Sequence, residues 1–100
     1  IQLRIGLKKI LKDIVIMITK IEKYGSSWCS PCKQLDRTLQ QITDIEIVKY
    51  DVDDYEDLAN EKRIKSVPTL IFYNGDNEVD RLIGAVPFET INKIIEKWNK

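Results

Sequence analysis

The sequence lacks histidine and contains two cysteines, Cys29 and Cys32. Without histidine, neither a Ser–His nor a Cys–His catalytic arrangement can form, so any proton transfer must involve carboxylates, lysines, thiols or water. Zinc sites are built mainly from cysteine and histidine, and two cysteines alone are too few ligands for most of them. We therefore predict no metal site in this chain.

An excess of one charge and a long hydrophobic run are missing as well. The 16 basic and 16 acidic residues cancel to a formal net charge of zero, which gives no electrostatic reason to bind nucleic acid or an anionic membrane surface. The longest apolar run, residues 14–18, is far shorter than the roughly 20 residues of a membrane span. It is also short for the core of a signal peptide. We predict neither a nucleic-acid partner nor a membrane partner.

The residues that are present fit one α/β domain. A chain of 100 residues with 43% hydrophobic residues has room for one hydrophobic core. Helical spacing of apolar residues predicts helices at residues 3–14, 30–43 and 87–99, and residues 53–63 suit a helix with Asp53 or Asp54 as its N-cap. The expected strands are residues 15–24, 45–52, 69–73 and 78–83, the last two joined by a turn at residues 74–77.

The order of these elements predicts the sheet. A helix between each pair of early strands indicates parallel crossovers, and the hairpin adds an antiparallel edge. Residues 69–73 are almost continuously apolar, which is typical of a strand buried on both faces.

The two cysteines form a Cys-x-x-Cys motif just after a predicted strand and at the start of a predicted helix. A helix N-terminus carries unpaired N–H groups and roughly half a positive charge, which stabilise a thiolate. A free cysteine is about 3% ionised at pH 7, and a pKa lowered to about 7 makes it half ionised. We predict that Cys29 is the attacking thiolate and that Cys32, one turn further, is the more buried resolving thiol.

Three other interpretations of the pair stay open: a zinc site, a purely structural disulfide, and two reduced cysteines without activity. The zinc site lacks further ligands. A structural disulfide that closes so small a ring constrains the unfolded chain by only roughly 2 kcal/mol. The position at a helix N-terminus favours redox chemistry over all three.

The motif Trp-Cys-Ser-Pro-Cys at residues 28–32 resembles the Trp-Cys-Gly-Pro-Cys active site of the thioredoxin family. Ser-Val-Pro-Thr at residues 66–69 resembles the family's cis-proline loop, and Lys-Tyr-Asp-Val-Asp at residues 49–53 resembles the strand end before its third helix. Gly75 and Gly84 fall where the family has its hairpin-turn and groove glycines. The resemblance implies a three-layer α/β fold, with helices flanking a central mixed four-stranded sheet.

The resemblance begins near Lys20 and continues to Lys100, so we expect a thioredoxin-like domain at residues 17–100. Met17 lies where short, glutaredoxin-like members of the family begin. Residues 1–16 are then expected to form an N-terminal helical extension.

The resemblance implies a thiol–disulfide oxidoreductase that reduces protein disulfides through Cys29 and Cys32, with that redox-active pair in place of a cofactor. A trans Pro68 at the start of a strand is the alternative from the residues alone, but the family loop implies a cis bond. Trp28 is expected to cover the site and meet substrates rather than to lie in the core. The implied supporting residues are Trp28, Ser30, Pro31, Lys49 and Pro68, and the implied substrate groove comprises Trp28, Val52, Val67, Pro68, Ile83 and Gly84.

Lys23 departs from the family pattern. It stands where thioredoxins typically carry a buried aspartate, six positions before the first cysteine, that is thought to help deprotonate the second. We expect the lysine side chain to reach solvent, which leaves Lys49 or a water as the proton route. The alternative is an inward-pointing ammonium that lowers a thiol pKa. Arg37 likewise replaces the proline that kinks the family's helix.

Two other functions are open. A glutathione-dependent glutaredoxin would carry Cys-Pro-Tyr-Cys and a Gly-Gly-Asp segment after the hairpin, where this chain has Ile-Gly-Ala-Val at residues 83–86. A non-catalytic binding module of the same fold is the other, and the intact cysteine pair argues against it. For the oxidoreductase we expect disulfide-containing protein substrates, a thioredoxin reductase as electron donor, a monomeric state and a cytoplasmic location.

Overall fold

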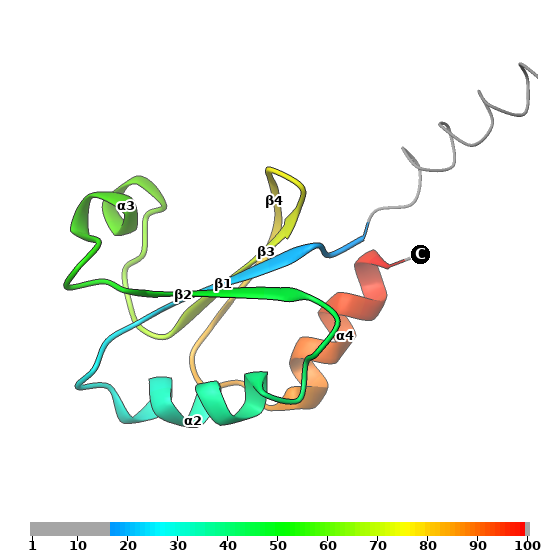
Figure 1. The fold of residues 1–100 in the computed structure, drawn as a ribbon, viewed down its shortest axis with the longest axis horizontal. Coiled ribbons are helices and arrows are strands. Elements are labelled where there is room, and N and C mark those ends of the chain that lie inside the picture. Colours follow the sequence, from blue (N-terminus) through cyan, green and yellow to red (C-terminus); the bar gives the residue numbers. More distant parts are fainter. Residues whose placement is uncertain (1–16, 100) are drawn as a thin grey trace, which may run out of the picture.

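Strands and helices alternate along the chain before a C-terminal hairpin and helix (Figure 1). The computed structural model describes residues 17–99, so the predicted helix at residues 3–14 and the extension at residues 1–16 lie outside the described residues. The elements are β1 (Lys20–Gly25), α2 (Ser30–Leu39), β2 (Glu46–Asp51), α3 (Glu56–Glu61), β3 (Thr69–Asn74), β4 (Asn77–Ile83) and α4 (Phe88–Trp98).

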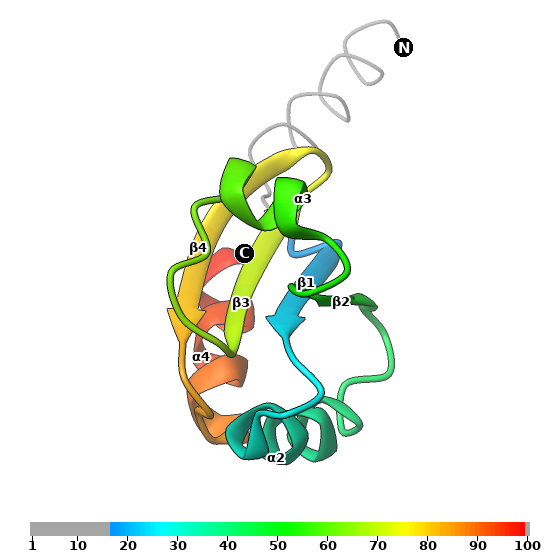
Figure 2. The same ribbon diagram turned by 90° about the vertical axis from the view of Figure 1, so that its left-hand side faces the viewer.

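The strands form one four-stranded sheet in the order β2-β1-β3-β4. Strand β1 is parallel to β2, with Lys23 opposite Lys49, and antiparallel to β3, with Lys23 opposite Leu70. Strands β3 and β4 form an antiparallel hairpin whose turn includes Gly75 at a φ of 61°. Helices α2 and α4 lie on one side of the sheet and α3 lies on the other (Figure 2). The predicted three-layer fold with a mixed four-stranded sheet is confirmed.

The prediction of a parallel crossover through residues 53–63 is wrong, because β3 runs antiparallel to β1. Helix α3 has six residues, so it extends only about 9 Å along its axis, whereas a six-residue strand is about 20 Å long. The helix alone is too short to carry the chain back along the sheet, and residues 62–68 lead to Thr69, which pairs with Tyr24 next to the Gly25–Asp51 pair. Strand β3 therefore begins at the end where β2 stops, as Figure 1 shows.

Two predicted helices are shorter in the structure. Helix α2 ends at Leu39 rather than at residue 43, because the backbone switches to i→i−3 hydrogen bonds at Gln41 and Ile42. Ile42 still packs on the core, which extends the apolar pattern past the helix. Helix α3 has Tyr55 as its N-cap rather than Asp53 or Asp54. The Asp51 side chain accepts the Asp53 N–H at 2.9 Å instead, so these aspartates lie in a turn.

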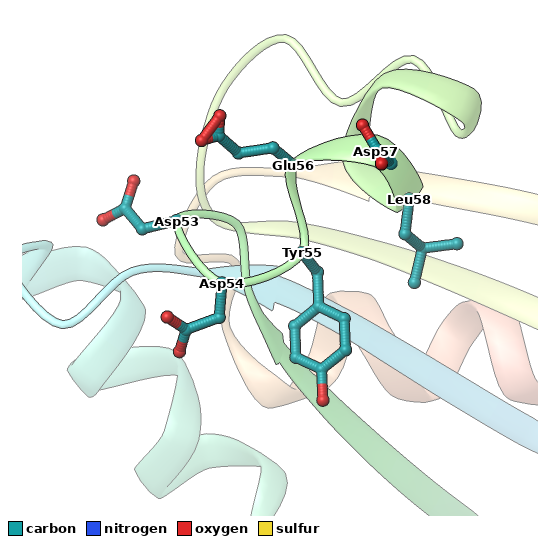
Figure 3. Close-up of a pocket in the computed structure, with 6 residues that line it drawn as sticks. All are labelled: Asp53, Asp54, Tyr55, Glu56, Asp57 and Leu58. Atoms are coloured by element: carbon teal, nitrogen blue, oxygen red, sulfur yellow. The ribbon is translucent and has the colours of Figure 1, made fainter.

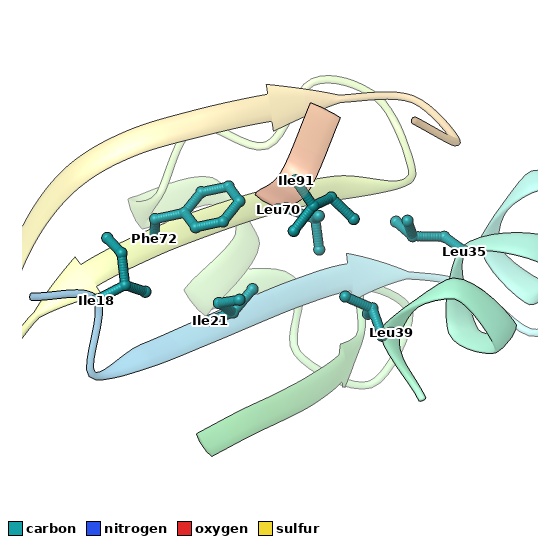
Figure 4. Packing of buried hydrophobic residues seen from close by; sticks show 7 residues of the cluster. All are labelled: Ile18, Ile21, Leu35, Leu39, Leu70, Phe72 and Ile91. Atoms are coloured by element: carbon teal, nitrogen blue, oxygen red, sulfur yellow. The ribbon is translucent and has the colours of Figure 1, made fainter. Parts of the chain in front are cut away.

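The main hydrophobic core fills the space between the sheet and the α2–α4 layer (Figure 4). Alternation along the strands points Ile21 of β1 and Leu70 and Phe72 of β3 toward this side. Leu35 and Leu39 of α2 and Ile91 of α4 complete the cluster with Ile18. This packing fixes α2 against the end of β1, which is where the cysteine motif lies.

The opposite face of the sheet carries a buried carboxylate. Glu22 Oε1 accepts hydrogen bonds from the hydroxyls of Tyr24 (2.9 Å) and Tyr73 (2.7 Å). Both rings belong to a second apolar cluster, with Leu58 of α3 packed against it. Burial and then the hydrogen bond to Glu22 raise the pKa of both tyrosines well above their usual value. The neutral phenols thus satisfy a charge that would be costly to bury alone.

Replacing Tyr73 by phenylalanine removes the shorter of the two hydrogen bonds to Glu22. We expect Tyr73→Phe to lower the free energy of unfolding by about 1.5–3 kcal/mol, because the bond involves a charged acceptor. Urea denaturation measures the change. The control is Tyr55→Phe, at an exposed ring, with an expected change within about 0.5 kcal/mol. Equal effects at the two positions would contradict this assignment.

The raised tyrosine pKa values predict a loss of stability in alkaline solution. Above about pH 10 the unfolded chain ionises these phenols while the folded protein keeps them protonated, so unfolding releases protons and stability falls as pH rises. The free energy of unfolding of the parent should therefore fall more steeply with pH than that of the Tyr24→Phe/Tyr73→Phe double variant. The expected difference is about 1.4 kcal/mol per pH unit for each tyrosine. Urea denaturation across this range tests it, and parallel curves for the two proteins would rule it out.

Candidate active site

The two cysteines lie where β1 leads into α2. Cys29 is the N-cap of α2 and Cys32 is in its first turn, with Pro31 between them in the first turn, as predicted. The two sulfurs are joined in a disulfide, with the Cα atoms 5.2 Å apart. Cys29 is 5% exposed and Cys32 1%. Cys29 is therefore the more accessible of the pair, in the order the sequence predicts.

The N-terminus of α2 is directed at Cys29. The Cys29 Sγ accepts a hydrogen bond from the Cys32 backbone N–H at 3.2 Å. The first turn of α2 carries no acidic residue, so no carboxylate on the helix opposes the positive end of its dipole. Once the disulfide is reduced, the Cys32 N–H and the positive end of the helix dipole favour a Cys29 thiolate over the thiol.

The loop before β3 lies beside Cys29. The Val67 carbonyl oxygen is 3.9 Å from Cys29 Sγ. The Val67–Pro68 peptide bond is cis, which confirms the prediction. Gly84, at a φ of 97°, donates its N–H to the Pro68 carbonyl oxygen at 2.8 Å. The structure thus brings Val67, Pro68 and Gly84 together beside Cys29.

Two apolar side chains next to these segments are exposed. Trp28 is 69% exposed and Ile83, at the end of β4, is 64% exposed. Ser30 is exposed as well, at the first position of α2. Trp28 Nε1 donates to Asp53 Oδ2 at 3.0 Å, which ties the tryptophan to the segment after β2. Val52, in contrast, packs with the second apolar cluster, so it does not join this group.

The segment after β2 forms an acidic rim near Trp28. Its carboxylates at Asp53, Asp54, Glu56 and Asp57 project in different directions (Figure 3). They border an open cavity of about 540 Å³ together with Tyr55 and Leu58. Asp53 is the member of this rim that contacts the active-site segment, through Trp28.

Lys23 does not reach solvent, so that prediction is wrong. The residue is 6% exposed, and its Nζ lies 2.7 Å from Oδ1 of Asp36 on α2. It occupies the α2 face of β1, since its neighbours Glu22 and Tyr24 point to the other face. The carboxylate on α2 gives the ammonium a partner inside the protein, and extension to solvent is not needed to satisfy it.

Asp36 is the site residue that sequence reasoning missed. It follows Cys32 by four positions on the same helix, which places both on one side of α2. Lys49 of β2 also contacts it, with Nζ 3.4 Å from Asp36 Oδ1. The helical spacing from Cys32 is the signal that could have identified this carboxylate. Lys49 was expected near the proton route, and the structure places it beside Asp36.

Comparison with known proteins gives one consistent result. A family model of thioredoxin matches residues 8–97. Thioredoxin-2 of Saccharomyces cerevisiae is 41% identical over 68 residues, which cover 64% of this chain and 65% of that protein. Chloroplastic thioredoxin M4 of Arabidopsis thaliana is 30% identical over 96 residues, covering 91% of this chain and 48% of that protein. A solved structure, a thioredoxin from Nicotiana alata, has a TM-score of 0.73 at 25% identity, and the match covers 95% of this chain and 87% of that one.

The chain thus spans less than two thirds of the length of either of these sequence relatives. No helix within residues 17–99 has the length and apolar character needed to cross a membrane.

Gly25 keeps the space between Lys23 and Cys32 open, and filling it should disturb the site. A Cβ at this position would lie 3.1 Å from Cys32 Sγ and 3.2 Å from Lys23 Nζ. We expect Gly25→Ala to lower the free energy of unfolding by about 1–3 kcal/mol through overpacking. Urea denaturation measures it against Ser27→Ala, at an exposed position. A Gly25→Ala protein as stable as the parent would show that the site can relax around a methyl group.

Proposed function

The chain belongs to the thioredoxin family, and on that premise we propose that the protein reduces disulfides in other proteins as a thiol–disulfide oxidoreductase. One observation carries the proposal: the bonded cysteine pair at the N-terminus of α2, with the Val67 carbonyl 3.9 Å from Cys29 Sγ. A nucleophilic thiolate, a resolving thiol within bonding distance and a backbone segment beside them are the parts that disulfide exchange requires.

The first step uses Cys29. Its thiolate attacks one sulfur of the substrate disulfide, forming a mixed disulfide with Cys29 while the other substrate sulfur leaves as a thiolate and takes a proton from solvent. An extended substrate segment would lie along the loop at Pro68. The exposed Trp28 and Ile83 supply apolar contact surface on the neighbouring segments.

The second step uses Cys32. Its thiolate attacks Cys29 Sγ, which forms the Cys29–Cys32 disulfide seen in the structure and releases the second substrate sulfur as a thiolate. Two electrons pass from the cysteine pair to the substrate. Another reductant must then reduce the pair, and a thioredoxin reductase is the donor that family membership suggests.

The alternatives receive less support. The relatives named above are thioredoxins, and the segment after the hairpin has no glutaredoxin signature, which argues against a glutathione-dependent reductase. A non-catalytic binding module would not require a bonded pair at a helix N-terminus. A monomeric state and a cytoplasmic location remain parts of the proposal. The first rests on family membership and the second on the use of both cysteines in one redox pair.

The two cysteines should give different products when each is replaced by serine. We expect Cys29→Ser to abolish insulin reduction, and Cys32→Ser to trap a mixed disulfide with substrate because attack survives and resolution does not. Non-reducing electrophoresis and mass spectrometry detect the adduct. Full turnover by Cys32→Ser would show that Cys32 is not the resolving thiol. A mixed disulfide on Cys29→Ser would show that Cys32 is the attacking one.

A further inference from the structure

A charged lysine is buried beside the resolving cysteine. An alanine Cβ built at Gly25 would lie 3.1 Å from Cys32 Sγ and 3.2 Å from Lys23 Nζ, so the sulfur and the ammonium flank the same small space. The sum of these two distances is the upper limit for their separation. Charges shift a thiol pKa over about 4–6 Å, and no side chain at Gly25 stands between the two groups.

Asp36 and two lysines form a charged cluster beside this space. Asp36 Oδ1 is shared between Lys23 (2.7 Å) and Lys49 (3.4 Å). Lys49 is about half exposed and its contact is screened by solvent, whereas Lys23 is buried. Of the two lysines, Lys23 is the one that reaches Gly25. The short contact with Asp36 Oδ1 holds the Lys23 ammonium in place.

An open cavity of about 300 Å³, lined mostly by residues with polar side chains, adjoins this cluster. The titratable groups that line it are Lys23 of β1, Asp36 of α2, and Lys49, Tyr50 and Asp51 of β2. Ser26 also lines it, and the buried Ser26 Oγ has no hydrogen-bond partner among residues 17–99. A cavity of this size and polarity has room for water, which can accept a proton and pass it out.

We propose that Lys23, held by Asp36, is a positioning residue that stabilises the Cys32 thiolate and so speeds release of the substrate from Cys29. This inference rests on the proposed function. In the resolving step the Cys32 thiol gives its proton to water. The resulting thiolate, opposite the Lys23 ammonium, attacks Cys29 Sγ, and the substrate sulfur leaves with the electron pair of the broken bond.

The test isolates Cys32 by placing it in the Cys29→Ser background. Its pKa is followed by the ultraviolet absorbance of the thiolate, with the Cys29→Ser/Cys32→Ser protein as the spectroscopic baseline. Adding Lys23→Met removes the ammonium and keeps an unbranched apolar stem, while Asp36 retains Lys49 as partner. Exchanging a buried ion-pair member in this way is compatible with folding when the remaining charge stays paired. Lys23→Gln, also neutral, provides a second comparison if the methionine variant is unstable.

The matched control is Lys20→Met, on the same strand. Lys20 also contacts a carboxylate, Glu22, at 3.4 Å, but it lies at the opposite end of β1 from Gly25. We expect Lys23→Met to raise the Cys32 pKa by about one unit or more and Lys20→Met to leave it unchanged. Each unit by which the Cys32 pKa rises lowers the fraction of thiolate about tenfold at neutral pH. A thiolate of higher pKa is also about threefold more nucleophilic, so the rate of attack falls by only about threefold.

With Cys29 restored, resolution of a mixed disulfide should therefore slow about threefold per unit in Lys23→Met at neutral pH. An unchanged Cys32 pKa in both neutral Lys23 variants, or an equal shift in Lys20→Met, would overturn the inference. Insulin reduction by the parent protein is scored separately. A parent that fails to reduce insulin while Lys23→Met shifts the Cys32 pKa would refute the proposed function and leave the electrostatic role of Lys23 intact.

Discussion

Hydrogen bonding of β1 to a strand on each side is the constraint on which the rest of the structure depends. With β2 and β3 as neighbours and helices covering both faces, residues 21–25 are all buried. The chain then leaves the sheet at Gly25 and enters α2 at Ser30, so the position of β1 determines where the cysteines lie. Packing of Leu35 and Leu39 on the core sets the direction of the helix.

Burial of β1 on both faces also explains why its two buried charges need partners in opposite layers. Glu22 is satisfied by two phenols on the α3 side, and Lys23 by Asp36 on the α2 side. Buried charges persist only when paired or hydrogen-bonded. The two solutions differ in consequence. The Glu22 cluster lies within an apolar layer and contributes to stability, whereas the Lys23 pair lies next to Cys32 and a cavity open to solvent.

Much of this arrangement was predictable from local patterns. The Cys-x-x-Cys motif between a strand and a helix located the bonded cysteine pair, and the continuous apolar run of β3 located the doubly buried strand. The direction of β3 could not be predicted in this way, because it depends on the path of the chain through the six-residue helix α3 and the residues after it. The burial of Lys23 was missed for a similar reason. Its partner Asp36 lies on another element, and a side chain considered alone gives no sign that a carboxylate will meet it.

The sheet ends at β2 on one side and at β4 on the other, and these two edges bear on how the protein behaves in crowded solution. An unpaired strand offers N–H and C=O groups to any other extended chain, and flat apolar edges extend into aggregates. Here both edges are charged, with Glu46, Lys49 and Asp51 on β2 and Glu78, Asp80 and Arg81 on β4. A register shift between Phe72 and Tyr73 further breaks the regular ladder of the β3–β4 hairpin. These charges and the register shift thus discourage further chains from adding to the sheet, in a protein for which we propose that an extended substrate segment binds beside Cys29.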